Sequence, residues 1–288
     1  MGMLLIVICL IMQQAESVVV KEYGKKYGKG GMFFNAAICL FAFVYFTLSE
    51  VFTGEYTFYF PKELWRYGIV SGLCYATGFY TLYVALKIGS YGLTRLLSSF
   101  GTIIPIVYGI AFLNEQPTRF TYASVVLILV SVFLMNYNSG GEKSKVSLKW
   151  ILCVTGTILA NAGIVIIAKS QQLVFDTKCS NEFLMISYAL ATFFLLCFGV
   201  LYERNQFKEA AGKVTVYGMM AGVFNGINNV VTLVVYIYVP LSIVSPVKTA
   251  LNLVLSFVLS VLLYKEKFTK KQLLSVLIGI VAVVLLNL

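Results

Sequence analysis

The chain has 288 residues, of which 59% are hydrophobic and only 12% charged, and its mean hydropathy is +0.87. A soluble protein of this length would need a much larger charged surface, so these values exclude that class. The net charge of +10 does not indicate nucleic-acid binding, because the lysines fall in short segments between apolar runs, as expected beside anionic lipid headgroups. We therefore expect an integral membrane protein whose partners are the lipid bilayer and a small molecule, with no nucleic acid.

Apolar runs of membrane-spanning length follow one another along the whole sequence. A helical span needs about 20 residues. This criterion predicts ten transmembrane helices, at residues 3–21, 32–53, 66–87, 91–113, 120–137, 148–169, 183–202, 214–238, 242–264 and 271–288. Residues 138–147 form a predicted linker between two five-helix units, 1–137 and 148–288. Pro105 interrupts the fourth segment, where a proline can supply a kink or hinge or be accommodated structurally.

The second unit repeats the first. Matching residues 150 or 151 positions apart include Gly68 and Gly218, Gly72 and Gly222, and Glu115 and Glu266. Because each unit has an odd number of spans, the second must enter the membrane from the opposite side. The predicted fold is therefore all-α, with ten transmembrane helices in two inverted repeats, an arrangement typical of secondary transporters that bind substrate near the midplane. The glycine pairs are predicted to let helices approach closely.

Cofactor and catalytic signatures are lacking in the sequence. It contains six cysteines without a C-x-x-C pair and no histidine, so we expect neither a metal site nor a cofactor. There is no Gly-Lys-Ser/Thr phosphate-binding loop, so ATP hydrolysis is not expected. The loops also lack the clustered Asp, His or Arg of membrane enzymes. We therefore predict that the protein is not an enzyme and has no catalytic residues.

Most of the lysines and arginines fall in the odd-numbered loops. The positive-inside rule places these loops in the cytoplasm and both termini outside. The orientation stays open, because Lys21, Lys87 and Lys149 lie close to helix ends. We expect the plasma (cytoplasmic) membrane as the location, and the sequence does not predict an oligomeric state.

Motifs around the fourth span of each unit resemble a known transporter group. They are the stretch from Tyr83 to Ser90, the acidic turn from Asn114 to Thr118, and their second copy between Pro240 and Thr269. By their order, spacing and repetition, the chain resembles the EamA-like branch of the drug/metabolite transporter (DMT) superfamily over nearly its whole length. This resemblance implies ten helices around a central cavity, alternating access, and export or exchange of small metabolites.

The first segment also resembles that of the small multidrug resistance transporters, in which a membrane glutamate precedes a lysine by two turns. The equivalent spacing here joins Gln13 to Lys21, and Asn161 to Lys169 in the second unit. An amide thus replaces the proton-binding carboxylate of that family. Glu16 lies three residues after Gln13 on the same helix face and is the candidate to replace it.

Charged groups at membrane depth cost roughly 2.5–3.5 kcal/mol on insertion scales, so each requires a reason. Arg95 and Lys248 lie near the starts of the fourth helices of the two units, where the helix dipole is also positive. We hypothesise an anion site for a substrate carboxylate or phosphate. Two other interpretations stay open: the cations extend to the headgroups, or one of them pairs with Glu16.

The eighth segment has a polar stripe that the third segment lacks. Asn225, Asn228, Asn229 and Thr232 share one helix face, whereas Tyr75 and Phe79 occupy the aligned region of the first unit. We expect the asparagines to line one wall of a cavity and the aromatic rings the opposite wall, although amides can also simply hold helices together. The predicted substrate-binding residues are Gln13, Glu16, Tyr75, Phe79, Arg95, Asn225, Asn228, Asn229, Lys248 and Asn252.

The predicted function is secondary transport of a small polar or anionic metabolite, amino-acid-like or phosphorylated, by alternating access. Two alternatives stay open. One is a lipid or lipid-linked sugar flippase, because the fold could open laterally towards the bilayer. The other is a proton-coupled exporter of small cationic drugs that uses Glu16.

Overall fold

The computed structural model describes residues 2–53, 59–99, 101, 103–112, 147–175, 179–238, 241–265 and 269–285, with short pieces between 119 and 130. All regular secondary structure in these residues is helical. The helices are α1 (Gly2–Lys26), α2 (Gly31–Thr53), α3 (Lys62–Ile88), α4 (Tyr91–Ser99), α5 (Ile103–Phe112), α7 (Leu148–Phe175), α8 (Ser180–Tyr202), α9 (Arg204–Tyr238), α10 (Leu241–Tyr264) and α11 (Lys270–Leu285). Residues 138–146, Glu115, Glu266 and most of the fifth predicted span lie outside the described residues.

Five helical stretches of the described chain are long and apolar enough to cross a membrane: Leu4–Lys26, Gly31–Ser49, Lys62–Ile88, Leu148–Ala168 and Asn181–Tyr202. Shorter apolar helices occur at Leu255–Tyr264 and Leu273–Ala282. These elements agree with the predicted all-α membrane fold. The number of ten spans remains a prediction.

The described residues of the fourth predicted span include two helices. α4 ends at Ser99 and α5 begins at Ile103, with Gly101 between them. A methyl group on Gly101 would lie 3.2 Å from the carbonyl oxygen of Ile158, so the chain at this point lies directly against the backbone of α7. Pro105 belongs to the first turn of α5, where its missing N–H breaks no helical hydrogen bond. The kink or hinge at Pro105 stays a prediction, because the neighbouring Phe100 and Thr102 lie outside the described residues.

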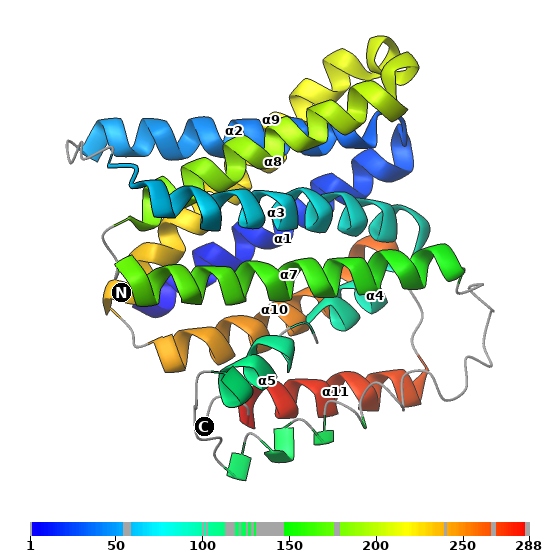
Figure 1. Ribbon diagram of the computed structural model, residues 1–288. Coiled ribbons are helices and arrows are strands. Elements are labelled where there is room, and N and C mark those ends of the chain that lie inside the picture. The colour runs from blue at the N-terminus through cyan, green and yellow to red at the C-terminus, as the bar shows by residue number, and fades with distance from the viewer. Residues whose placement is uncertain are drawn as a thin grey trace.

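The second helices of the two units, α2 and α8, pack side by side in opposite directions (Figure 1). Gly199 of α8 lies against the ring of Phe33, and Tyr188 lies against Phe46, with ring centroids 5.3 Å apart. Residue numbers thus rise along α2 while they fall along α8. Equivalent helices of the two units are antiparallel, as the inverted repeat predicts.

The remaining contacts between the units also occur in matched pairs. α3 packs antiparallel on α7, where Gly78 faces Ala160 and Cys74 faces Gly163. The corresponding helices α9 and α1 pack in the same antiparallel way. α3 also packs along α8, and α9 along α2. Exchanging the two units therefore reproduces the packing, which places α1 and α9 together with α3 and α7 at the interface between the repeats.

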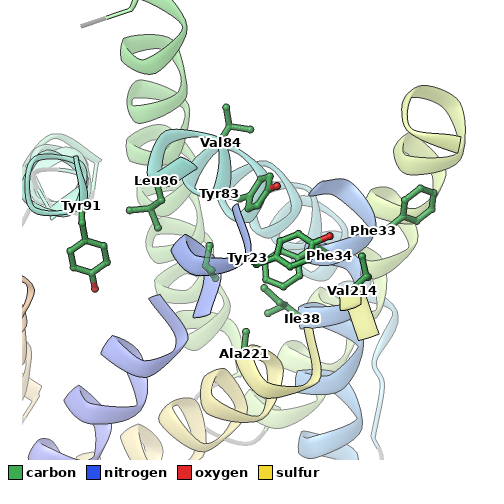
Figure 2. Close-up of a cluster of buried hydrophobic side chains, with 11 residues drawn as sticks. Tyr23, Phe33, Phe34, Ile38, Tyr83, Val84, Leu86, Tyr91, Val214 and Ala221 are labelled. Atoms are coloured by element: carbon green, nitrogen blue, oxygen red, sulfur yellow. The ribbon is translucent and has the colours of Figure 1, made fainter. Parts of the chain in front are cut away.

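A cluster of aromatic rings closes the interface of α1, α2, α3 and α9 at one end of the bundle (Figure 2). Tyr23 stacks on Phe34 with ring centroids 4.0 Å apart and planes inclined by 12°. Tyr83 and Tyr217 lie 6.2 Å and 5.9 Å from Tyr23. Because Tyr217 belongs to the second unit, this aromatic cluster joins the two repeats.

The turn between α1 and α2 lies at the same end and is fixed by side chains from the second unit. Gly28 and Gly30 adopt positive φ angles of 61° and 65°, which glycine tolerates without steric cost. The N–H of Gly30 donates to Gln206 Oε1 at 2.9 Å, and the N–H of Met32 donates to Glu203 Oε2 at 2.7 Å. Residues of the α8–α9 junction thus satisfy the free N–H groups at the start of α2.

Described residues beside the odd-numbered loops lie at this end. Lys87 donates to the carbonyl of Gly28, Lys25 lies over the ring of Tyr264, and Trp150 packs against Gly89. Exposed cations of this end come from α1, α3, α7, α9, α10 and α11: Lys25, Lys26, Lys29, Lys87, Lys149, Lys213, Lys265, Lys270 and Lys271. This gathering of charge agrees with the predicted cytoplasmic side, and the orientation remains a prediction.

Candidate functional site

Near the middle of helix α1, two polar side chains contact different neighbouring helices. Gln14 and Glu16 are two residues apart, so they point in nearly opposite directions from the helix axis. Glu16 faces α9, and Gln14 faces α4 and α10. We call these groups the Glu16 cluster, with Tyr188, Asn225 and Asn229, and the Gln14 cluster, with Tyr91, Asn252 and Ser256.

The Glu16 cluster is a chain of hydrogen bonds between the two units. Asn225 Nδ2 donates to Glu16 Oε2 at 3.1 Å. The side-chain oxygen of Asn225 accepts two hydrogen bonds, from the hydroxyl of Tyr188 at 2.8 Å and from Asn229 Nδ2 at 3.1 Å. Tyr188 and Asn225 are buried, whereas Glu16 and Asn229 are partly exposed. The structure thus brings together three residues that the sequence predicted for the site.

Tyr188 also connects these polar groups to the predicted aromatic residues. Its ring lies 4.7 Å from that of Tyr75 and 6.2 Å from that of Phe79, and Tyr75 and Phe79 are themselves stacked 6.1 Å apart. The aromatic rings therefore adjoin the asparagine stripe through Tyr188. Their position on a cavity wall opposite the stripe stays a prediction.

The Gln14 cluster is buried between α1, α4 and α10. The hydroxyl of Tyr91 donates to Gln14 Oε1 at 2.6 Å, and Gln14 Nε2 donates to Ser256 Oγ at 2.8 Å and to the side-chain oxygen of Asn252. Asn252 was predicted from the sequence, but its partner is Gln14. The neighbouring Gln13 supplies its carbonyl oxygen to Ser17 Oγ at 2.7 Å.

Lys21 lies on the same face of α1 as Gln14, two turns further along. It is only 1% exposed, and its ammonium group lies 5.1 Å from the centroid of the Tyr91 ring and 4.0 Å from that of Tyr264. Cation–π contact with two rings helps to offset the loss of hydration. The lysine that the sequence placed near a helix end is therefore enclosed by protein.

Arg95 lies one turn after Tyr91 on α4, on the same helix face. Its positive charge acts on the carboxylate of Glu16. Among the described residues the two groups form no ion pair, and the buried Nε of Arg95 has no hydrogen-bond partner. One turn further, the buried hydroxyl of Ser98 also has no partner there. Buried polar atoms are nearly always paired, so two unpaired ones on one face require an explanation.

The other predicted residues are placed less completely. Asn228 is 9% exposed, and its carbonyl oxygen accepts a hydrogen bond from Cys9 Sγ at 3.8 Å. Lys248 belongs to α10, but its side chain and that of Thr232 lie outside the described residues. Within the part of the chain that the structure describes, no group of three His, Cys, Asp or Glu side chains could hold a metal ion.

The sequence reasoning missed Tyr188, Gln14, Tyr91, Ser98 and Ser256. One available indication was the asymmetry between the units, which had identified the asparagine stripe. The equivalent of Tyr188 in the first unit is the buried Cys39, so a hydroxyl occurs in one unit only. Gln14 precedes Lys21 by seven residues, so the spacing indicates that the two side chains share one face of the helix.

Comparison with known proteins identifies the family. The model of the EamA-like transporter family matches residues 1–137 and 148–288. No curated protein matches the sequence. A crystal structure of a protein with 12% sequence identity superposes with a TM-score of 0.65, over 99% of this chain and 95% of that chain, and this likeness concerns the fold alone. The two matched segments agree with the two repeats, and the chain belongs to the EamA-like transporter family, within the DMT superfamily of membrane transporters.

Proposed function

We propose that this membrane transporter moves a small amino-acid-like metabolite across the plasma membrane by alternating access. The substrate's acidic group binds at Arg95 and Ser98, and its ammonium group binds at Glu16. The clusters on both sides of α1 lie at the interface between the inverted repeats, where secondary transporters bind their substrates.

The observation that most supports this proposal is that the buried Nε of Arg95 has no hydrogen-bond partner among the described residues. Leaving a buried donor unpaired costs about 1–3 kcal/mol, and more for a charged group. An anionic ligand would recover this cost by accepting hydrogen bonds from Arg95 and Ser98. Guanidinium binds carboxylates and phosphates through paired hydrogen bonds, which suits it to such a ligand.

The carboxylate of Glu16 favours an amino acid over a phosphorylated compound. Glu16 lies within the electrostatic influence of Arg95 without forming an ion pair with it. A dianionic phosphate at Arg95 would be repelled by this carboxylate. An ammonium group on the same substrate would instead be attracted, and a zwitterion satisfies both charges at once. The rings of Tyr75 and Tyr188 adjoin Glu16 through Asn225 and add a surface that also favours cations.

A binding panel on the detergent-purified protein tests this proposal. Ligands that bind the folded state raise its melting temperature by mass action. We expect stabilisation by one or more zwitterionic amino acids, lost in both Arg95→Gln and Glu16→Gln. Arg66→Gln is the matched control, because Arg66 is exposed near the other end of α3. Stabilisation by sugar phosphates or nucleotide sugars instead of amino acids would overturn the proposed substrate class.

The Glu16 cluster also supports a second candidate, proton-coupled export of organic cations. A carboxylate beside aromatic rings is suited to a lipophilic cation. In that case the same panel would show stabilisation by cations such as tetraphenylphosphonium, lost in Glu16→Gln but kept in Arg95→Gln. The response of Arg95→Gln therefore separates the two candidates.

A further inference from the structure

We infer that Tyr188 is a positioning residue that orients Asn225 so that Glu16 presents its carboxylate to the ammonium group of the substrate. This inference rests on the proposed function, because it assigns Glu16 to the cationic end of the ligand. Tyr188 lies in the middle of α8 and is only 1% exposed.

The argument begins with the amide of Asn225, whose two ends have opposite hydrogen-bonding character. Its NH₂ group can only donate and its oxygen can only accept. A carboxylate needs the donor end. In the structure Nδ2 faces Glu16 Oε2 at 3.1 Å, which leaves the oxygen for the hydroxyl of Tyr188 at 2.8 Å.

Two donors hold the amide in this orientation. Besides the Tyr188 hydroxyl, Asn229 Nδ2 donates to the same oxygen at 3.1 Å and to the carbonyl oxygen of Asn225 at 2.9 Å. If the amide rotated by half a turn, its oxygen would face the carboxylate of Glu16 and its NH₂ group would face that of Asn229. Both pairs would repel. The Tyr188 hydroxyl can donate to the amide oxygen only in the observed orientation, so Asn229 and Tyr188 together favour the orientation that serves Glu16.

The ring of Tyr188 fixes the position of its hydroxyl. It contacts Phe46 on α2 at 5.3 Å as well as Tyr75 and Phe79 on α3. The side chain is thus held by the first unit while its hydroxyl acts on α9 of the second.

Fold symmetry does not account for this hydroxyl. Ser187 meets Gly72 as Ile38 meets Gly222, so the next residue, Tyr188, corresponds to Cys39. Cys39 is fully buried and has no hydroxyl. Packing of this helix pair therefore does not require a tyrosine. Tyr188→Phe keeps the ring and removes only the hydrogen bond, so it is the appropriate variant.

The test is a double-mutant cycle on ligand affinity. The dissociation constant of L-leucine, or of whichever zwitterionic amino acid stabilises the protein most, is measured for the wild type, Tyr188→Phe, Glu16→Gln and the double variant. We expect Tyr188→Phe to weaken binding about tenfold, the effect of losing one such hydrogen bond. The double variant should bind like Glu16→Gln alone, because Tyr188 acts through Asn225 on Glu16.

A second ligand separates positioning from a general structural role. Affinity for 4-methylpentanoate, which is leucine without its ammonium group, should be the same in Tyr188→Phe and wild type. Tyr202→Phe, at the exposed end of α8, is the control and should bind both ligands normally.

The outcomes distinguish this inference from the proposed function. If L-leucine and other amino acids fail to bind the wild type, or bind Glu16→Gln as tightly as wild type, both ideas fail. Two results would overturn the positioning role alone, provided that Glu16→Gln weakens binding of the amino acid. One is that the effects of the two substitutions on its dissociation constant multiply in the double variant. The other is that Tyr188→Phe loses as much affinity for 4-methylpentanoate as for the amino acid.

Discussion

Gly72 and Gly222 make the same close contact in the two repeats. A methyl group on Gly72 would lie 2.9 Å from the carbonyl oxygen of Ser187 on α8, and one on Gly222 would lie 2.7 Å from that of Ile38 on α2. In each unit the third helix therefore touches the backbone of the other unit's second helix. The predicted packing role of the repeated glycines is confirmed.

Gly222→Ala should consequently destabilise the protein. The added methyl group meets backbone atoms that cannot rotate away, and overpacking of this kind costs about 1–3 kcal/mol. Gly212→Ala is the control on the same helix, because no atom of the described residues lies within 4 Å of the added methyl group. The measurement is the melting temperature in detergent. Equal melting temperatures for the two variants would show that the helices separate easily at Gly222.

Gln14→Ala should cost more stability than Gln13→Ala. Removing Gln14 leaves the buried hydroxyl of Tyr91 without its acceptor and Ser256 without its donor. An unpaired buried group costs about 1–3 kcal/mol. Gln13 is the adjacent residue of the same type, so the helix propensity changes equally in both variants. Thermal unfolding of both proteins measures the difference, and a larger loss in Gln13→Ala would contradict the placement of Gln14.

Glu203→Gln should change the pH dependence of stability. Burial raises the pKa of the Glu203 carboxyl above its usual 4.5, while the Met32 N–H and the charge of Lys87 act in the opposite direction. A raised pKa in the folded state means that the group's contribution to stability is present below pH 4.5 and lost as the pH rises through the folded pKa. The amide keeps an acceptor for Met32 and does not titrate.

Melting temperatures from about pH 4 to about pH 8 test this expectation. The wild type should lose stability relative to Glu203→Gln as the pH rises through this window. Glu22→Gln, an exposed acid at the same end of the bundle, is the control. A constant difference between wild type and Glu203→Gln across the range would show that the ionisation of Glu203 is not coupled to folding.

The aromatic cluster at the lysine-rich end should be stabilised mainly by ring packing. Tyr23 is fully buried, and its hydroxyl donates to the carbonyl of Lys29 at 2.6 Å. Tyr23→Phe removes that hydrogen bond at a cost of about 1 kcal/mol. Tyr23→Ala also removes the ring, and we expect a loss of about 3–5 kcal/mol. Chemical or thermal unfolding of the two variants compares these effects, and similar losses would assign the stability to the hydrogen bond.

Much of the fold was predictable because repetition constrains it. The shift of 150 residues between Gly68 and Gly218 predicted equivalent helices, and the antiparallel pairing of α2 and α8 agrees with the predicted inversion. The close approach of Gly101 to the backbone of α7 was not predicted, because it depends on how the helices pack. Only the packed structure contains that contact.

The sequence predicted several residues of the candidate site but not their hydrogen-bond partners. Glu16 and Asn225 were both identified because polar groups in an apolar helix are costly. Their partner Tyr188 was not, because an aromatic residue in a membrane segment is compatible with ordinary packing. Gln13 was chosen over Gln14 because its spacing to Lys21 matches that of the small multidrug resistance transporters. Neighbouring residues point to different sides of a helix, and in the structure it is the amide of Gln14 that faces Tyr91.

The most direct test of the central claim is amino-acid exchange in proteoliposomes that contain the purified protein. Vesicles loaded with an unlabelled amino acid are diluted into the same labelled amino acid, and uptake is followed for wild type, Arg95→Gln and Arg66→Gln. Transport by a site that binds a zwitterion through Arg95 and Glu16 predicts rapid exchange in wild type and Arg66→Gln, and a loss in Arg95→Gln. Exchange by Arg95→Gln at the wild-type rate, or uptake no faster than in protein-free vesicles for every amino acid tested, would contradict it.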